Sequence, residues 1–297
     1  MDNQALDLSA AAATRHGNRD TDTNGNEFVF TDRDFRYISS LIGEHAGIVL
    51  GEVKRDLVYG RLVKRLRSLG MRRFSDYCDY LQRGDNDEFE QFVNALTTNL
   101  TSFYRESHHF DYLESVILPG LIREPGRRSL RIWSAGCSTG PEPYSIAMSV
   151  AESVPADWDV KILATDIDTK VISTAQAGVY DLEVAQRGLT QQRLKRWALR
   201  GKGERSTQIK MRPELQSMIR FRPLNLLEPW PLKNAFDVVF CRNVVIYFDK
   251  ATQEKLFDRF ANQLAPDGHL IIGHSESLNK ICDRFSLVGK TIYRRTR

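Results

Sequence analysis

The stretch LRIWSAGCSTGPEPYS, residues 130–145, decides the fold class. A short apolar run ends at a turn between Gly136 and Gly140, and a helical pattern begins near Glu142. A strand, a glycine turn and a helix in this order bring backbone N–H groups close to a nucleotide-like ligand. The stretch therefore indicates either a cofactor site in an α/β sheet or a purely structural connection between a strand and a helix.

The spacing of the two glycines argues against a dinucleotide cofactor. The dinucleotide fingerprint is G-x-G-x-x-G, whereas Cys137, Ser138 and Thr139 separate the two glycines here. Pro141 suits the start of a helix but has no N–H to offer a phosphate. The loop can therefore pass close to a ligand without forming a good pyrophosphate site.

The composition is that of a globular protein of about two domains. The chain has 297 residues, of which 41% are hydrophobic and 27% are charged. No run approaches the roughly 18 apolar residues of a membrane span, and the N-terminus lacks a signal-peptide pattern. The four cysteines are scattered without a CxxC motif, which argues against disulfides and structural zinc. We therefore expect a cytoplasmic protein that holds no metal and does not insert into a membrane.

Helical spacing dominates the N-terminal part of the chain. Residues 1–27 are polar and lack apolar periodicity, so we expect a disordered tail there. Thr31 fits the N-cap of a helix that begins at Asp32. Further helices are predicted at residues 54–69, 74–81, 87–97 and 107–118. Together these elements predict an N-terminal all-helical domain over residues 28–120.

Strands and helices alternate over residues 121–297. Strands are predicted at residues 130–134, 159–165, 219–223, 236–241, 269–272, 285–288 and 291–295, with helices at 143–153, 169–176 and 253–263. This alternation implies a mainly parallel, doubly wound sheet, and the last two strands form a hairpin at an antiparallel edge. The pattern breaks over about residues 179–215, which we interpret as an inserted subdomain with small strands of its own.

Polar residues follow the predicted strands where an open α/β sheet binds its ligand. Asp166 can accept hydrogen bonds from the two hydroxyls of a ribose, in NAD and in S-adenosylmethionine equally, or it can cap the next helix. For Asp168 the capping role is favoured. Arg242 and Tyr247, after a later strand, complete a candidate site together with the glycine turn.

Six motifs in order give the chain a close resemblance to the CheR-type chemotaxis receptor methyltransferases, which are protein-glutamate O-methyltransferases. The motifs are TNLTSFYR at 98–105, SAGCSTGPEPYS at 134–145, ATDID at 164–168, NLL at 225–227, CRNVVIYF at 241–248 and GHSES at 273–277. The resemblance runs from about Phe28 to the C-terminus. It implies a Rossmann-like methyltransferase sheet with an N-terminal all-helical domain and a small inserted β-subdomain.

The resemblance implies that the cofactor is S-adenosylmethionine and that S-adenosylhomocysteine is the product. It assigns to cofactor binding Asn99, Thr101, Arg105, Glu142, Asp166, Asn225, Leu226, Arg242 and Asn243. It also implies that Arg105 and Tyr247 position the substrate carboxylate, with Arg242 assisting. A glutamate has a pKa of about 4.3 and is ionised near neutrality, so the reaction needs no general base.

Other conspicuous side chains are expected to have structural roles. His108 and His109 are predicted to lie on a helix surface, and His274 is expected to be structural. Cys137 and Cys241 are predicted to be small packing residues near the cofactor.

Basic residues gather between Lys54 and Arg73, where eight stand against the single acid Asp56. The members proposed to share a face are Lys54, Arg61, Lys64 and Arg65. The cluster could bind nucleic acid, but aromatic interleaving and a nucleic-acid motif are missing. It could also be a plain solvated face. The resemblance instead implies a surface that docks the acidic methylation helices of a chemoreceptor.

Further partner predictions rest on the same resemblance. In some family members the β-subdomain binds a peptide at the receptor C-terminus by strand addition, and a monomer is expected. The competing functions are a methyltransferase for a nucleic acid or small molecule, and a degenerate module that only binds the cofactor. Arg242-Asn243 stands where amino-directed enzymes carry an Asn/Asp-Pro-Pro-Tyr loop, and the set of Arg105, Asp166, Arg242 and Tyr247 is intact.

Overall fold

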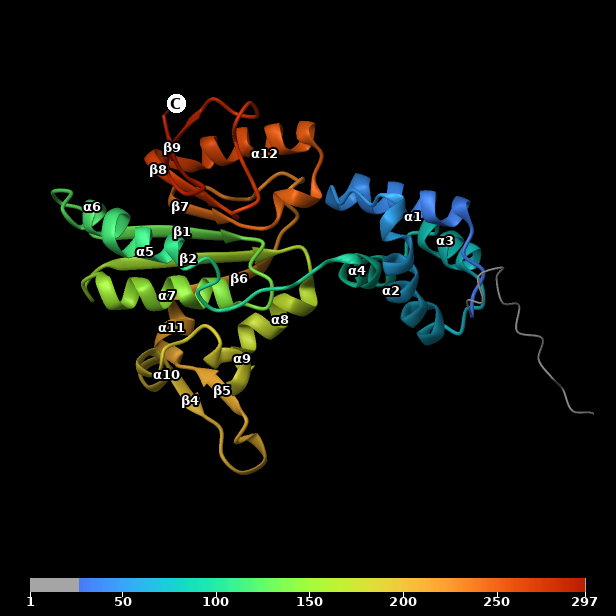
Figure 1. Ribbon diagram of the computed structural model, residues 1–297, viewed down its shortest axis with the longest axis horizontal. Coiled ribbons are helices and arrows are strands. Elements are labelled where there is room, and N and C mark those ends of the chain that lie inside the picture. Colours follow the sequence, from blue (N-terminus) through green and yellow to red (C-terminus); the bar gives the residue numbers. More distant parts are fainter. Residues whose placement is uncertain (1–26, 297) are drawn as a thin grey trace, which may run out of the picture.

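The first helices of the chain form a bundle with its own core in the computed structural model, which describes residues 27–296 (Figure 1). They are α1 (Asp32–Ala46), the short η1 (Glu52–Lys54), α2 (Arg55–Ser68), α3 (Phe74–Gln82) and α4 (Asn86–Leu96). Thr31 caps α1, and Asp34 completes a reciprocal capping box, so the predicted cap is confirmed. The predicted tail lies outside the described residues, apart from Glu27.

A second group of helical turns packs on the sheet rather than in this bundle. It comprises α5 (His108–Tyr112), a π-helical turn η2 (Leu113–Ile117) and α6 (Leu118–Ile122). Phe103, Phe110 and Leu113 share one hydrophobic core with Ile132 of the sheet. We therefore propose that the N-terminal helical domain ends near Thr97, ahead of the predicted boundary at residue 120.

The central sheet has seven strands in the order β6-β2-β1-β7-β8-β10-β9. The strands are β1 (Ser129–Ala135), β2 (Asp159–Asp166), β6 (Ile219–Pro223), β7 (Phe236–Cys241), β8 (Leu264–Ile272), β9 (Phe285–Gly289) and β10 (Ile292–Arg295). All neighbours pair in parallel except β10, which is antiparallel to both β8 and β9. The predicted doubly wound sheet with an antiparallel hairpin edge is confirmed.

Helices cover both faces of the sheet, with α7 (Pro141–Ser153) on one side and α12 (Lys250–Gln263) on the other (Figure 1). The side chains of β1 alternate between the two cores. Ile132 packs into the core that contains α7, and Trp133 packs into the core that contains α12. Successive strand residues point to opposite faces, so a run of apolar residues in β1 supplies both layers.

The predicted insertion forms a separate three-stranded antiparallel sheet that projects from the main domain (Figure 1). It follows α8 (Thr169–Ala177) and contains β3 (Val179–Asp181), β4 (Ala198–Arg200) and β5 (Gln208–Met211), with the helices α9 (Leu182–Gln186), α10 (Gln191–Trp197) and α11 (Pro213–Met218). The strands were expected from the sequence, but the three helices were not. Each of these helices has nine residues or fewer, too short for a clear periodicity.

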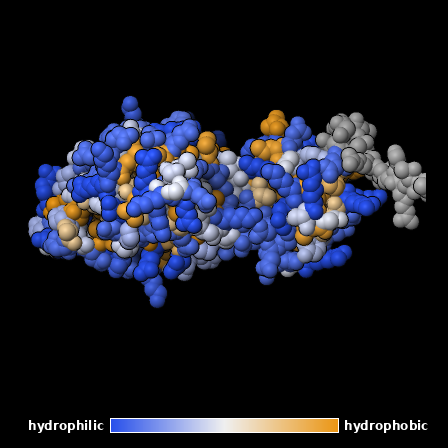
Figure 2. Space-filling model, turned by 90° about the horizontal axis from the view of Figure 1, so that it is seen from below, coloured by the Kyte–Doolittle hydropathy of each residue, from blue (hydrophilic) through white to orange (hydrophobic). Residues whose placement is uncertain are grey.

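The surface of the molecule is largely hydrophilic and shows a larger and a smaller lobe (Figure 2). Within residues 27–296, no helix is both long enough and apolar enough to cross a membrane.

Candidate functional site

A pocket opens where the strand order reverses, at the carboxyl ends of β1, β2 and β7. Strand β1 pairs with β2 on one side and with β7 on the other, and ligands of open α/β sheets bind at such a switch point. The pocket lies between this sheet edge and the helical bundle. Every residue predicted to hold the cofactor lines it, namely Asn99, Thr101, Arg105, Glu142, Asp166, Asn225, Leu226, Arg242 and Asn243, and Lys54 and Tyr247 line it as well.

The glycine turn after β1 allows the backbone to come close to the loop that follows β7. Gly136 has a φ of 88°, and a Cβ there would lie 2.3 Å from Cγ2 of Val244. A side chain at this position would therefore displace a wall of the pocket. The sequence suggested a close approach to the ligand, and the structure adds a close approach to Val244.

Asp166, at the end of β2, presents a buried carboxylate to the pocket. Its oxygens accept backbone hydrogen bonds from Ser138 at 2.8 Å and from Asp168 at 3.0 Å. Burial raises the pKa of Asp166 to about 6. A carboxylate has about four acceptor sites, so sites remain for two ligand hydroxyls.

Asp168 has the capping role predicted for it. One oxygen accepts from the backbone N–H groups of Lys170 at 2.9 Å and Val171 at 3.2 Å at the start of α8. The other oxygen accepts from Thr97 at 2.7 Å and from the amide of Asn99 at 2.8 Å. Asp168 thereby ties the segment between the two domains to the pocket wall.

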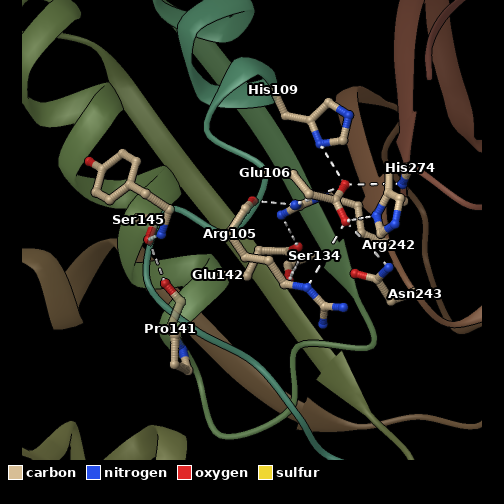
Figure 3. Close-up of polar contacts among 12 residues, drawn as sticks. Arg105, Glu106, His109, Ser134, Pro141, Glu142, Ser145, Arg242, Asn243 and His274 are labelled. Atoms are coloured by element: carbon tan, nitrogen blue, oxygen red, sulfur yellow. Dashed lines mark hydrogen bonds and ion pairs between the residues drawn. The ribbon is translucent and has the colours of Figure 1, made fainter. Parts of the chain in front are cut away.

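Arg242, after β7, is buried beneath the pocket in a network of acids (Figure 3). Its Nη1 donates to Oε2 of Glu142 at 3.0 Å, while Oε1 of Glu142 accepts from the Ser134 hydroxyl at 2.7 Å. Its Nη2 donates to the backbone oxygen of Arg105 and lies 3.4 Å from Glu106. Since both terminal nitrogens already have protein partners, the geometry favours a positioning role over the predicted contact with substrate.

Glu106, which was not among the predicted site residues, connects this network to neighbouring segments. Its carboxylate lies 2.8 Å from Nδ1 of His274, accepts from the backbone N–H of His274 at 3.1 Å, and is within 3.4 Å of the Asn243 amide (Figure 3). Burial acts to raise its pKa, but the His274 hydrogen bond and the charge of Arg242 outweigh burial and lower the pKa to about 2. Its place directly after the TNLTSFYR motif was the available signal.

The prediction that His109 lies on a helix surface is wrong. Its side chain is fully buried, and Nε2 lies 2.9 Å from the hydroxyl of Thr291. Burial, reinforced by the charge of Arg242, lowers the pKa of His109 to about 3, so the ring is neutral. The short α5 packs this ring between Glu106 and the β9–β10 turn, which no local pattern reveals.

Glu276, also missed, holds the loop after β7 in place. Its carboxylate accepts the backbone N–H groups of Asn243 at 3.0 Å and Ile246 at 3.3 Å. Asn243 has a φ of 59°, and these bonds help to hold that left-handed backbone. Glu276 lies in the GHSES motif, which gave the only sequence signal. Cys137 and Cys241 are fully packed, as predicted, and burial raises the pKa of both thiols well above the usual range.

Comparison with known proteins decides the family. Residues 33–97 match the model of the CheR methyltransferase all-alpha domain, and residues 99–294 match that of the CheR methyltransferase SAM-binding domain. The chain belongs to the CheR methyltransferase family. It is 46% identical over 272 residues to a chemotaxis protein methyltransferase of Escherichia coli K12, covering 89% of this chain and 91% of that protein. It is 43% identical over 269 residues to chemotaxis protein methyltransferase 2 of Pseudomonas aeruginosa, covering 90% and 94%.

The pocket of this CheR-family methyltransferase fits its cofactor, S-adenosylmethionine. The free acceptor positions of Asp166 suit the ribose hydroxyls. Ile167, Leu224 and Leu226 give the pocket apolar walls of the kind that suit an adenine ring. Asn225 donates to the backbone oxygen of His45 at 2.6 Å, so the pocket wall is tied to α1.

Arg105 and Tyr247 occupy the side of the pocket that remains accessible in this CheR-family enzyme. Nη1 of Arg105 donates to the backbone oxygen of Leu100 at 2.8 Å, and 32% of the side chain is exposed. Tyr247 is partly exposed, and the Nζ of Lys54 lies 5.5 Å from the centre of its ring. Both side chains can therefore meet a substrate that enters the pocket.

The four basic residues predicted to dock a receptor do not share one environment. Arg61 donates to the backbone oxygens of Leu96 at 2.7 Å and Thr97 at 2.8 Å. Arg65 is paired with the buried Glu88, which also accepts from Tyr77 at 2.7 Å. These two guanidinium groups stabilise the bundle and the segment after it. Lys54 lines the pocket, and Lys64 is exposed on α2.

Proposed function

We propose that this enzyme transfers the methyl group of S-adenosylmethionine to glutamate side-chain carboxylates of chemoreceptors. The products are glutamyl methyl esters, which serve chemotactic adaptation, and S-adenosylhomocysteine. The observation that supports the proposal is the position of Arg105 and Tyr247, two accessible side chains in the pocket wall whose chemistry suits a carboxylate. The relatives, which are chemotaxis protein methyltransferases, support the chemotactic setting.

The proposed reaction requires that the substrate carboxylate be correctly oriented, and it requires no proton transfer. The cofactor supplies a methyl group on a positively charged sulfur. A glutamate substrate, with a pKa of about 4.3, arrives already ionised. The planar fork of Arg105 matches a carboxylate, and Tyr247 offers one directional hydroxyl. Together they would hold the attacking oxygen in line, with the reacting atoms about 3–3.5 Å apart.

The walls of the pocket favour this reaction by excluding water. Charge is neutralised as an anionic oxygen meets a cationic centre, so a less polar surrounding favours the transition state. Ile48, Leu226 and Phe248 provide such surroundings. Arg242 and Glu142, paired beneath the pocket, would keep the backbone of Arg105 in place.

We also propose that the basic side of α2 docks the acidic methylation helices of the receptor. The exposed Lys64 and Arg67 are the available charges on that helix, although Arg67 also pairs with Glu27. Binding through this surface should weaken as salt rises, because salt screens exposed charges. The further proposals of a receptor peptide at the β-subdomain, a monomeric state and a cytoplasmic location rest on the family resemblance.

One experiment tests the proposed reaction. The enzyme is incubated with methyl-tritiated S-adenosylmethionine and a receptor cytoplasmic fragment, and the product is treated with base. Carboxyl methyl esters release volatile tritiated methanol, whereas N-methyl products do not. A fragment whose candidate glutamates are changed to glutamine is the matched control and should release none. Base-stable label in the protein, or label in added nucleic acid, would contradict the proposal.

A further inference from the structure

An apolar rim surrounds the mouth of the cofactor pocket. Five of the ten large hydrophobic side chains that are exposed in residues 27–296 stand at this rim, namely Val49, Val53, Leu57, Leu100 and Ile246. Val53 is 96% exposed and Leu100 is 80% exposed. Isolated exposed apolar residues are common, but a group at one site marks an interaction surface.

The residues that line the pocket place this group at its mouth. Leu57 and Leu100 line the pocket themselves. Val53 precedes the lining residue Lys54 and stands four residues, about one helical turn, before Leu57. The rim therefore has one side on the helical bundle and another on the segment that carries Arg105.

The remaining two rim residues lie on either side of one backbone hydrogen bond. The backbone N–H of Val49 donates to the backbone oxygen of Tyr247 at 2.9 Å, so Val49 lies beside the loop that carries Ile246. Ile246 immediately precedes Tyr247, which lines the pocket. Apolar side chains thus stand next to both groups that we propose to hold the substrate carboxylate.

We propose that this rim binds apolar side chains that flank the methylated glutamate on the same face of the substrate helix. The inference rests on the proposed function and adds a determinant of which glutamates are methylated. A glutamate side chain is short, so its carboxylate reaches Arg105 and Tyr247 only when the substrate backbone lies across the rim. Neighbours at three or four residues from that glutamate then face the enzyme.

The substrate segment that occupies the rim is an acidic helix, because basic side chains and apolar side chains lie next to each other here. Lys54 lies at the mouth between Val53 and Leu57, and Lys64 is exposed farther along α2. A substrate helix that inserts a glutamate into the mouth would contact the apolar rim close to that glutamate. Farther along, it would contact the basic side chains of α2. Burying apolar side chains is favourable and insensitive to screening, so the rim would add selectivity that salt does not remove.

The test uses the full chain with Val53→Ser on one side of the mouth and Leu100→Ser on the other. Leu287→Ser, an exposed leucine on the edge strand β9 and outside the pocket lining, is the matched control. The readouts are kcat and KM for a receptor fragment that the wild-type enzyme methylates, and the Kd for S-adenosylhomocysteine. Each rim variant should raise KM by roughly 10-fold, equally at low and high salt, and the control should not.

A change in the substrate makes the test specific. In the fragment, an apolar residue three or four positions from the methylated glutamate is replaced by serine. This change should raise KM for the wild-type enzyme. It should raise KM little further for Val53→Ser, because the substitution in the enzyme and the substitution in the fragment remove the same contact. Independent, additive effects would overturn the inference.

The remaining outcomes separate this inference from the proposed function. If the wild-type enzyme methylates the fragment and both rim variants have the same KM as the wild type, the inference about the rim is overturned but the proposed function is not. No methylation of any receptor glutamate by the wild-type enzyme overturns both proposals. A rim variant that changes the sedimentation of the enzyme instead of KM would show that a second copy covers the rim, which also overturns the inference.

Discussion

Arg242 and Glu142 form a buried ion pair beneath the cofactor pocket, with Nη1 of the arginine 3.0 Å from Oε2 of the glutamate. The pair joins the end of β7 to the start of α7, two segments that lie 100 residues apart in the sequence. Arg242 also donates to the backbone oxygen of Arg105. This relationship separates two arginines that the sequence grouped together, one that is tied into the site and one that we propose to face the substrate.

Arg242→Ala and Arg105→Ala should therefore have different consequences. Loss of Arg242 leaves the buried carboxylate of Glu142 and the partly buried carboxylate of Glu106 without their shared cation, which costs roughly 3–5 kcal/mol of unfolding free energy. Loss of Arg105, whose side chain is 32% exposed, should remove most turnover while stability changes by about 1 kcal/mol. Urea unfolding measures the stability of the two variants, and single-turnover rates measure their activity. Equal losses of stability would contradict the distinction.

Tyr247→Phe should slow methyl transfer without weakening cofactor binding. The ring stays beneath Lys54, and only the hydroxyl that orients the carboxylate is lost. Removing one oriented donor from a reaction site typically slows a reaction by about 100-fold or more. Single-turnover transfer at saturating cofactor measures the rate, and calorimetry measures the affinity. An unchanged single-turnover rate would remove Tyr247 from the mechanism.

Cofactor affinity should depend on pH through Asp166, whose pKa burial raises to about 6. We propose that the ionised carboxylate accepts hydrogen bonds from the ribose hydroxyls, so affinity should fall as the pH drops through that value. Asp166→Asn should weaken binding by roughly 10- to 100-fold, the range for hydrogen bonds to a charged group. The affinity of the Asp166→Asn variant for the cofactor should also not change with pH in this range. Calorimetric titrations at several pH values provide the check, and parallel pH profiles would exclude the assignment.

Glu106→Gln should destabilise the protein near neutrality and much less in acid. The pKa of Glu106 is lowered to about 2 in the folded protein, against about 4.3 when unfolded. The stabilisation is therefore fully present above about pH 5 and is lost as the pH falls toward 2, with a size of roughly 2–3 kcal/mol. Urea unfolding of both proteins across this range measures the difference. A difference that persists unchanged in acid would contradict the ion-pair explanation.

Arg65 and Lys64 are neighbours on α2, but their substitution should have different effects, on stability for Arg65 and on receptor binding for Lys64. Arg65→Ala leaves Glu88, which is 5% exposed, without its cation and should cost about 3 kcal/mol in unfolding free energy. Lys64→Ala should leave stability within about 0.5 kcal/mol but raise KM for a receptor fragment at low salt. Thermal unfolding and salt-dependent kinetics distinguish the two. A stability loss in both variants would indicate that the basic face is structural throughout.

The secondary structure was largely determined by local pattern. Residues 130–145 predicted the strand, turn and helix that begin the sheet, and Thr31 and Asp168 predicted two helix caps. These features depend on neighbours within a few residues, where hydrophobic period and capping chemistry act directly. The residues lining the pocket were reached through motifs, because five of the six motifs end or follow a strand of the main sheet, and TNLTSFYR lies in the segment after α4.

The tertiary structure decided what each charged side chain contacts. Arg242 pairs with Glu106 and donates to the backbone oxygen of Arg105, which lies 137 residues away in the sequence. Arg65 meets Glu88 across a helix interface. Sequence shows that a charge is present but not whether a partner lies opposite it. Nor could the sequence show that His109 is buried, because the short helix α5 packs this ring against Lys290 and Thr291 of the β9–β10 turn. Burial and ion pairing depend on distances between distant segments, and those distances exist only after the sheet and helices have packed.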